Sequence, residues 1–251
     1  MAVALEFASE AHVLLALKQL ANPERAKQAS RYFKTGPGEY GEGDKFLGLS
    51  VPETRSVAKT FKHLEPAELY ELVHSEWHEA RLCALLILVD QFRRNKLAAG
   101  RKEIFEHYLR LLDDNLVNNW DLIDTAAPHL GAYLIDQADA MAVLLELSKS
   151  PSLWKRRASI IFTFAFIRAG VYEPTILIAE KLLTDKEDLI HKAVGWMLRE
   201  TGNRNLTVLR AFLTAHASYM PRTTLRYAIE KLSAEERAEW LGKKAKAAKT
   251  T

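Results

Sequence analysis

The chain has 251 residues, of which 48% are hydrophobic and 27% charged, and its formal net charge is +3. This is the composition of an ordinary globular protein, long enough for one large domain or two small ones, and the mild positive charge does not by itself indicate a polyanionic partner. The single cysteine, Cys83, excludes an internal disulfide and a zinc site built from several cysteines. Its apolar neighbours, LCALLILV, predict that it is a buried packing residue.

The two ends of the chain carry little targeting information. The N-terminus, MAVALEFASEAHVLLALKQL, lacks the basic segment of a secretory signal, and no run reaches the roughly 18 apolar residues that a membrane span needs. We therefore expect a soluble, cytoplasmic protein with no membrane partner. We also expect a single domain over residues 1–240 and a basic, disordered tail at 241–251, which either adds nonspecific affinity for phosphate or has no role.

Residues 35–44, TGPGEYGEGD, form a predicted loop that holds four of the eleven glycines. The loop lacks the Lys-Ser/Thr ending of a nucleotide-binding loop, and its acidic residues would repel phosphate, so a P-loop is excluded. Two interpretations remain: a flexible connection, or a mobile flap beside a binding groove.

Helical spacing of apolar residues follows this loop through most of the chain. Ser50 and Glu53 flank Val-Pro in a capping-box pattern, which predicts that a helix begins there and covers 51–62. Glycine and proline are sparse and no strand alternation is found, so an all-α fold is favoured. The breaks, among them EPAE and ETGNRN, are mostly short, as expected for antiparallel neighbours. The other predicted helices are 66–74, 79–93, 101–112, 139–149, 153–169, 173–184, 188–200, 206–217 and 222–232.

Four segments of the chain resemble one another: each opens a helix with an aromatic or apolar residue, followed by a polar cluster and an apolar run. They are 75–89, 118–134, 152–166 and 188–200. One residue from each, Arg81, Asp124, Arg157 and Trp196, gives spacings of 43, 33 and 39 positions. Such a period predicts an α-solenoid of HEAT-like repeats, in which corresponding residues of successive second helices line one concave face. Trp120 would join Asp124, Arg157 and Trp196 there.

Trp120 and Asp124 share one helix face because they are four residues apart, whereas Asp121 points about 100° away round the helix. Asp124 is either aimed at a positively charged ligand or is a structural carboxylate that bonds a helix terminus or pairs with Arg157. Two tryptophans and a carboxylate inside a basic rim would favour a cation attached to a polyanion. Trp196 is otherwise a core residue. The preceding Gly195 lowers helix stability and often permits the close approach of another group.

Other residue patterns point to no metal and no cofactor. Lys155, Arg156 and Arg157 are consecutive and fan round the helix, so they are either mostly solvated or are offset by an anion such as DNA phosphate. The eight histidines show no HExxH and no paired Cys/His spacing. His74 and His78 are four residues apart but have no third ligand, so we predict surface histidines.

Five segments between about residue 20 and about 230 carry a family resemblance. They are NPERAKQASRYFK (22–34), FLGLSVPETR (46–55), WDLID (120–124), SLWKRRASIIF (152–162) and IHKAVGWMLRE (190–200). The chain resembles the AlkD-type family of HEAT-like-repeat DNA glycosylases, which excise alkylated purines. The resemblance implies that Asp124 is the catalytic carboxylate, that Trp120 and Trp196 contact the sugar, that Arg157 is the active-site arginine and that Tyr32 faces the DNA.

The resemblance implies hydrolysis of the N-glycosidic bond of N7-methylguanine or N3-methyladenine in double-stranded DNA, with the damaged nucleotide left largely stacked. We expect a monomer that needs no cofactor. Two alternatives remain: a noncatalytic protein that binds branched or distorted DNA, and a protein-binding HEAT scaffold. The residues expected to hold phosphates are Lys155, Arg156, Lys192, Arg222 and Arg226.

Overall fold

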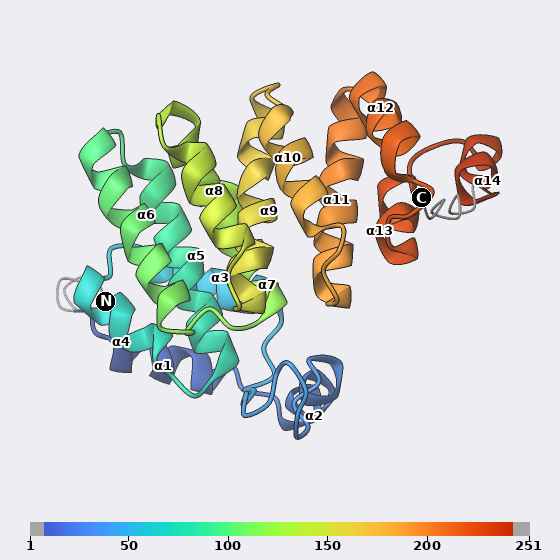
Figure 1. Ribbon diagram of the computed structural model, residues 1–251. Coiled ribbons are helices and arrows are strands. Elements are labelled where there is room, and N and C mark those ends of the chain that lie inside the picture. Colours follow the sequence, from blue (N-terminus) through green and yellow to red (C-terminus); the bar gives the residue numbers. More distant parts are fainter. Residues whose placement is uncertain (1–7, 243–251) are drawn as a thin grey trace. The chain divides into compact units, whose positions relative to one another are not determined.

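The computed structural model describes residues 8–242, and helices make up its regular structure (Figure 1). Within that range there is no β-strand, only an isolated bridge between Lys45 and Trp77. The predicted all-α fold of helical repeats is therefore confirmed. In the same part of the chain, no helix combines the length and the hydropathy that crossing a membrane requires.

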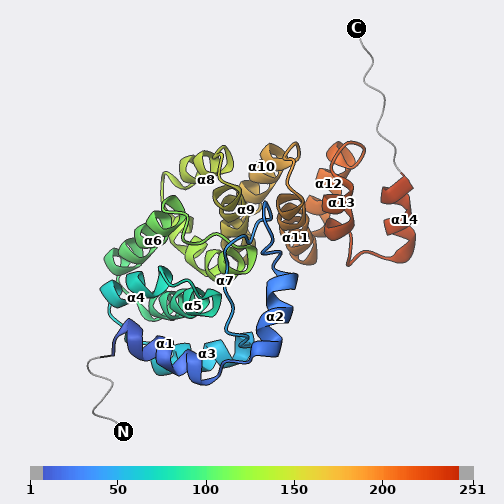
Figure 2. The same cartoon turned by 90° about the horizontal axis from the view of Figure 1, so that it is seen from below.

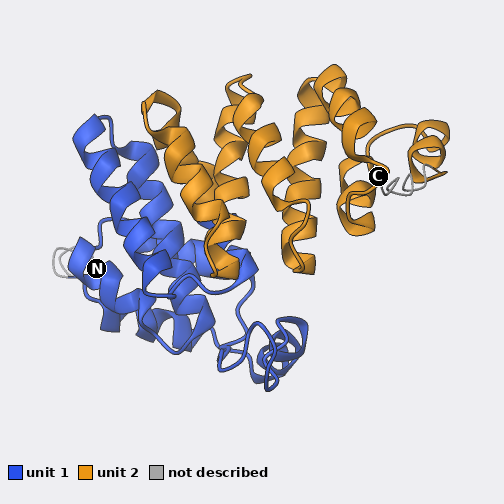
Figure 3. Ribbon diagram, viewed as in Figure 1, with its two compact units in different colours: residues 1–126 blue, residues 127–251 orange. Residues whose placement is uncertain are grey.

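The chain divides into two compact units, Met1–Ala126 and Ala127–Thr251 (Figure 3). The predicted single domain over 1–240 stays a prediction. The helices of the first unit are α1 (Glu10–Gln19), α2 (Pro23–Tyr32), α3 (Val51–Thr60), α4 (Pro66–Val73), α5 (His78–Arg94), α6 (Ala98–Asp113) and most of α7 (Trp120–Leu130). Those of the second are the 3-10 helix η2 (Gly131–Asp136), α8 (Ala140–Ser148), α9 (Leu153–Arg168), α10 (Glu173–Leu182), α11 (Asp188–Arg204), α12 (Leu206–His216), α13 (Arg222–Ala228) and α14 (Ala234–Gly242).

The central helix of the first unit is α5, which packs against α1, α3, α4 and α6 (Figure 2). It is buried without a break from His78 to Val89. A helix that is covered on all sides has to be apolar all round, which explains the run LCALLILV. Cys83 lies in that run, as predicted, and burial raises the pKa of its thiol to about 12.

The second unit is built in two layers. Helices α8, α10 and α12 form one layer and α9, α11 and α13 form the other (Figure 2). Each helix of the second layer packs on its neighbours: α9 contacts α8, α10 and α11, while α11 contacts α12 and α13. The two similar segments 152–166 and 188–200 thus lie on adjacent helices of one layer, as the repeat predicts.

Most predicted helices are confirmed within a few residues, and the errors have physical causes. The helix predicted over 51–62 begins at the expected capping box, in which the Ser50 amide donates to a carboxylate oxygen of Glu53 at 2.7 Å. Helices α1, α2 and α14 were not predicted because they bury few residues, and α2 buries none. The break predicted at ETGNRN is present but shorter than expected, since α11 continues to Arg204 and only Asn205 separates it from α12. The predicted tail begins inside α14, and its remainder, 243–251, lies outside the described residues.

The glycine-rich loop 35–44 is anchored at its end, which the sequence did not indicate. The Gly41 amide donates to the Lys34 carbonyl at 3.1 Å, and the Asp44 carboxylate is held by a guanidinium of α5. A side chain at position 41 is sterically excluded, because a Cβ there would lie 2.3 Å from the Phe33 carbonyl oxygen. The loop therefore folds back on the end of α2.

Gly195 permits the close approach that the sequence predicted. A Cβ at this position of α11 would lie 2.7 Å from the Thr224 carbonyl oxygen and 2.5 Å from Cβ of Tyr227, both in or beside α13. Glycine thus lets α11 and α13 pack backbone to backbone.

We expect Gly195→Ala to lower the free energy of unfolding by up to about 2 kcal/mol. The gain in helix propensity is about 1 kcal/mol, whereas an overpacked contact with backbone atoms costs about 1–3 kcal/mol. Urea denaturation measures the difference. Gly242→Ala, where a Cβ meets nothing within 4 Å, is the matched control. Equal stability of the two variants would contradict this packing argument.

Candidate active site

Trp120 and Asp124 lie one turn apart on α7, and both side chains are half-buried. The helix begins at Trp120 because Asn119 supplies its first acceptors. The Asn119 side-chain oxygen accepts the Trp120 amide at 2.8 Å, and its backbone carbonyl accepts the Ile123 amide at 3.2 Å. Asparagine is one of the residues that best satisfies the free amides of a helix N-terminus. The spacing predicted from WDLID is therefore realised on a helix.

Trp120 is part of an aromatic cluster that also contains Tyr32, Phe33, Phe46 and His78. Phe33 stacks on Trp120 with ring centroids 5.5 Å apart and an interplanar angle of 17°, while Tyr32 meets Trp120 edge-on at 6.1 Å. Phe33 in turn stacks on Phe46 at 5.1 Å. Tyr32 is 66% exposed. The exposed Tyr32, the half-buried Trp120 and the buried Phe46 thus belong to one continuous group of rings.

Asp124 lies close to a buried phenol of α6. Burial raises the pKa of the Tyr108 hydroxyl far above its usual range, and the negative charge of Asp124 raises it further. Tyr108 is fully buried. It therefore stays protonated.

A buried cluster of charged side chains lies behind the aromatic rings. The two ring nitrogens of His78 face two carboxylates: Nε2 lies 2.7 Å from Asp121 and Nδ1 lies 3.2 Å from Asp44. Asp44 also accepts hydrogen bonds from Arg81 at 2.5 Å and from the Asn119 amide group at 3.0 Å. His78 is 2% exposed. The predicted surface position is therefore wrong for His78, because its imidazole is enclosed by two acidic partners.

The pKa values of this cluster follow from the pairing. Burial by itself lowers the pKa of His78, but the charge and the hydrogen bond of Asp121, together with the bond to Asp44, raise it to about 9. Burial by itself raises the pKa of Asp44, but its hydrogen bond with His78 and the charge of Arg81 hold it below the usual value. His78 is therefore an imidazolium at neutral pH.

Arg157 and Trp196 lie on adjacent helices of the second unit. Arg157 of α9 is 4% exposed and donates to the Leu189 carbonyl at the start of α11. Trp196 of α11 is half-buried, with its ring 6.1 Å from that of Phe164 on α9. Trp120 and Asp124 belong to the first unit, so the convergence of all four residues on one surface stays a prediction.

The five predicted phosphate contacts differ in how far their charges are already engaged. The Arg156 guanidinium pairs with Asp185 at 2.6 Å and donates to the carbonyls of Ser150 and Pro151. Lys155 is half-buried, and Lys192, also half-buried, pairs with Asp188 at 2.8 Å within its own helix. The remaining two are exposed on α13: Arg222 and Arg226.

Sequence reasoning missed the residues that hold α7 in place, namely His78, Asp44, Arg81 and Asn119. The available signal was the position of Asn118 and Asn119 directly before WDLID, where an N-cap is expected. The pairing of His78 had no local signal, because its partners are 34 and 43 positions away.

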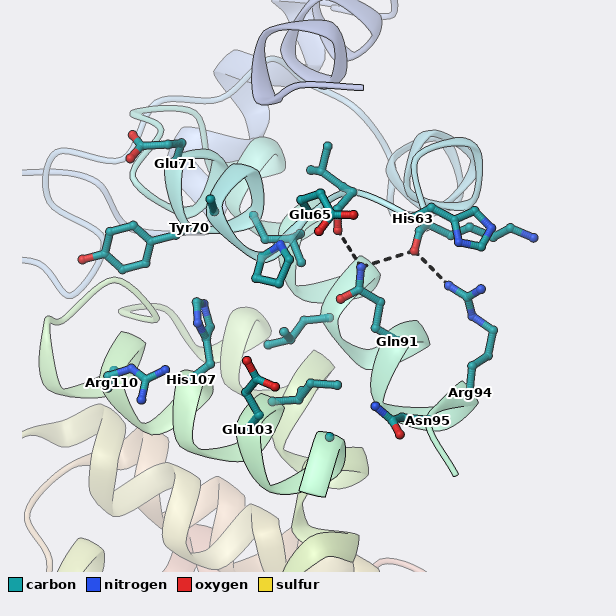
Figure 4. Close-up of a pocket in the computed structure, with 18 residues that line it drawn as sticks. His63, Glu65, Tyr70, Glu71, Gln91, Arg94, Asn95, Glu103, His107 and Arg110 are labelled. Atoms are coloured by element: carbon teal, nitrogen blue, oxygen red, sulfur yellow. Dashed lines mark hydrogen bonds between the residues drawn. The ribbon is translucent and has the colours of Figure 1, made fainter. Parts of the chain in front are cut away.

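A separate cavity of about 820 Å³ lies in the first unit (Figure 4). It is lined by α4, the end of α5 and α6, and Gln91 at its wall donates to the carbonyls of Lys62 and Leu64. None of the predicted site residues lines it. Among residues 8–242, no group of three or more His, Cys, Asp and Glu side chains is placed to hold a metal ion.

The fold and the site define an all-α helical-repeat protein with a carboxylate and an indole on successive turns of one helix. The chain belongs to the family described as DNA alkylation repair enzyme, whose sequence model matches residues 13–232. Its role is therefore in DNA alkylation repair, which requires an interaction with DNA.

One solved structure is described as a predicted DNA alkylation repair enzyme from Enterococcus faecalis. It is 16% identical, with a TM-score of 0.67 over 85% of this chain and 97% of that chain. At this identity the likeness supports the fold alone. No curated protein gave a significant match to the sequence.

The raised pKa of His78 predicts a specific loss of stability at alkaline pH. The folded pKa of about 9 lies above the unfolded value of 6.5, so the stabilisation is fully present below pH 6.5 and is lost as the pH rises through about 9. We expect the urea midpoint of the native protein to fall across this window more steeply than that of His78→Gln. His74→Gln, at an exposed histidine of the preceding turn, is the control and should behave like the native protein. Parallel curves for the native protein and His78→Gln would contradict the assignment.

Proposed function

We propose that the protein is an AlkD-type DNA glycosylase, which hydrolyses the N-glycosidic bond of cationic alkylated purines such as N7-methylguanine and N3-methyladenine in double-stranded DNA. The observation that carries this proposal is the half-buried carboxylate of Asp124, one helical turn from the half-buried indole of Trp120. Family membership in DNA alkylation repair supports the substrate class.

The chemistry needs little besides a well-placed anion. Alkylation at N7 of guanine or N3 of adenine makes the base cationic, so it leaves readily without being protonated by the enzyme. As the bond breaks, positive charge develops on the deoxyribose, the same problem that a carboxylate solves in sugar hydrolases. Asp124 would stabilise that charge and orient the attacking water.

Trp120 would supply a second attraction for the developing cation. Phe33 already covers one face of the indole, so a deoxyribose would meet its other face or its edge, next to Asp124. A cation over an indole gains about 0.5–2 kcal/mol, depending on how completely water is excluded. Trp196 would contribute in the same way from the second unit, whereas the positive charge of Arg157, the active-site arginine that the family resemblance implies, would instead hold a phosphate.

Selectivity would come from the charge of the lesion. A concave face that grips the phosphates could leave the damaged nucleotide largely stacked, in contrast to glycosylases that extrude the base into a pocket. An uncharged lesion such as hypoxanthine would then be a poor substrate, because its glycosidic bond is intrinsically stronger.

The central test of the proposal is Asp124→Asn. We expect about a 100- to 1000-fold lower rate of 7-methylguanine release, the range found when one group that stabilises transition-state charge is removed, with DNA affinity unchanged or higher. Release of free base from dimethyl-sulfate-treated duplex under single-turnover conditions measures the rate. Asp139→Asn, at an exposed aspartate before α8, is the control. A wild-type rate for Asp124→Asn would exclude Asp124 as the catalytic anion.

The salt dependence of DNA binding tests the phosphate contacts. We expect Arg226→Ala to weaken binding and to reduce the slope of log affinity against log salt by about one unit, because the exposed guanidinium would release one counterion. Arg156→Ala should leave the slope unchanged and lower the melting temperature, because Arg156 is paired with Asp185. If Arg156→Ala reduces the slope and Arg226→Ala does not, Arg156 rather than Arg226 is the phosphate contact.

The same assays separate the two alternatives. A protein that binds distorted DNA without catalysis would show the salt-dependent affinity and release no base from methylated duplex. A protein-binding scaffold would show neither the affinity nor the excision. Trp120→Ala and Trp196→Ala distinguish site residues from core residues, since a site residue affects base release while leaving the protein folded.

A further inference from the structure

We propose that His78 is a positioning residue, which fixes the rotation of α7 about its own axis and thereby the aim of Trp120 and Asp124. The inference rests on the proposed glycosylase function for its catalytic consequence, but its structural part can be tested without substrate. His78 itself reaches neither of the two predicted catalytic side chains through a hydrogen bond of its imidazole; it acts through Asp121 and Asp44.

The first step is the protonation state of the imidazole, which the geometry dictates. Both ring nitrogens of His78 face carboxylate oxygens, at 2.7 Å from Asp121 and 3.2 Å from Asp44. An ionised carboxylate can only accept a hydrogen bond, so both nitrogens must donate, and only the imidazolium has two N–H groups. His78 is thus a buried cation that joins two anions.

The second step is charge balance. Asp44 also pairs with Arg81, whose side chain is 8% exposed, so two carboxylates and two cations form a charge-balanced group within the first unit. Buried charges are tolerated only when they are paired in this way. Loss of the His78 charge would leave Asp44 and Asp121 with a single cation between them, and the group would have to rearrange or take up water.

The third step is where this group holds α7. Three consecutive contacts reach the start of the helix: Arg81 donates to Asn118 at 2.6 Å, Asn119 donates to Asp44 at 3.0 Å, and Asp121 accepts from His78. In an α-helix each residue advances by about 100°, so Asp124 projects between Trp120 and Asp121, about 60° from the latter. A helix held at Asp121 therefore cannot rotate without moving Asp124 by the same angle.

The fourth step is the rigidity of the structure that holds His78 and Asp44. His78 and Glu79 begin α5, the central helix of the first unit. The His78 amide donates to the Lys45 carbonyl at 2.8 Å, and the buried carboxylate of Glu79 accepts the amides of Leu47 and Gly48 at 2.9 and 2.7 Å. The segment that carries Asp44 is thus fastened to the same turn of α5 that presents the imidazolium.

The fifth step concerns Trp120 itself. The ring of His78 stacks on Phe46 at 4.7 Å and lies 4.9 Å from Phe33, and Phe33 stacks on Trp120. The charged imidazole is attracted to the face of Phe46. Phe33 lies between His78 and Trp120, so a change in the position of the imidazole would be passed to the indole through Phe33. His78 therefore restrains α7 twice, once through Asp121 and once through the rings behind Trp120.

The expected consequence is a loss of rate with little loss of affinity. A misplacement of a catalytic group by about 1 Å can lower a rate about 100-fold, whereas DNA affinity depends mainly on phosphate contacts elsewhere. We expect His78→Gln and Asp121→Asn each to lower single-turnover release of 7-methylguanine about 10- to 100-fold, with the dissociation constant for DNA changed less than about threefold.

The experiment combines these rates with fluorine NMR of protein labelled with fluorotryptophan, in which the resonance of Trp120, one of five tryptophans, is assigned with Trp120→Phe. The Trp120 resonance should shift or broaden in both variants and stay in place in His74→Gln. The double variant His78→Gln/Asp121→Asn should be no slower than the worse single variant, because the connection that Asp121→Asn breaks is already broken in His78→Gln. Circular dichroism and melting curves establish that each variant is folded at the assay temperature.

The outcomes separate this inference from the proposed function. Native rates in both variants, or an unmoved Trp120 resonance, would overturn the positioning role even if the native protein is a glycosylase. If the native protein releases no base, the proposed function fails, and a shifted Trp120 resonance still supports the restraint on α7. If both variants fail to fold, the native protein is titrated instead. The Trp120 resonance should then move near pH 9, where His78, which lies among Asp44, Asp121 and Arg81, loses its proton. A Trp120 resonance that does not move across this pH range would overturn the proposal.

Discussion

The structure of the first unit depends on one buried interaction, the imidazolium of His78 between the carboxylates of Asp44 and Asp121. Taking charges out of water costs several kcal/mol for each ion, and the attraction between them compensates only when the geometry is good and the remaining lone pairs are satisfied. Here Arg81 and Asn119 supply the further donors to Asp44. A pair of apolar residues would have stabilised this position at least as well, so the cluster is better understood through what it fixes. It determines how the loop 35–44, α5 and the start of α7 are oriented with respect to one another.

The second unit fixes its helices by other means. Arg157 is buried and donates to a backbone carbonyl at the start of α11, and Gly195 lets the backbone of α11 approach α13. Both of these contacts join one helix to the backbone of the next, and ion pairs such as Arg156–Asp185 and Arg199–Glu230 add to them. In the first unit the partners are side chains contributed by a loop and by two helices. The difference agrees with the sequence, since the glycine-rich loop that ends at Asp44 lies in the first unit.

Local sequence patterns predicted the helices well, but they predicted the contacts between distant parts of the chain poorly. The four-residue spacing of Trp120 and Asp124 and the capping box at Ser50 both act within a few residues, and the structure contains each of them as predicted. Gly195 permits a close approach, as predicted, but its sequence neighbours did not indicate that the partner is α13. The environment of His78 depends on partners more than thirty positions away in either direction. Histidine is common both on surfaces and in buried pairs, so its sequence context alone could not decide between them. Helix α2 escaped prediction for another reason: it buries no residue, so its sequence lacks the apolar spacing of a helix that faces the core.

A site that relies on a substrate's own charge needs accurate placement more than reactive groups. In the proposed reaction the leaving base is already cationic, so the enzyme contributes one anion and a few aromatic faces, and their effect depends on where they lie relative to the sugar. A charge at Asp124 that is displaced or free to rotate would stabilise the transition state and the ground state alike, and uniform binding of that kind does not increase the rate. The need for accurate placement explains why four charged groups are buried at the start of α7 despite the cost in free energy. The restraint that they impose is structural, but its benefit appears only when a positive charge develops beside the helix.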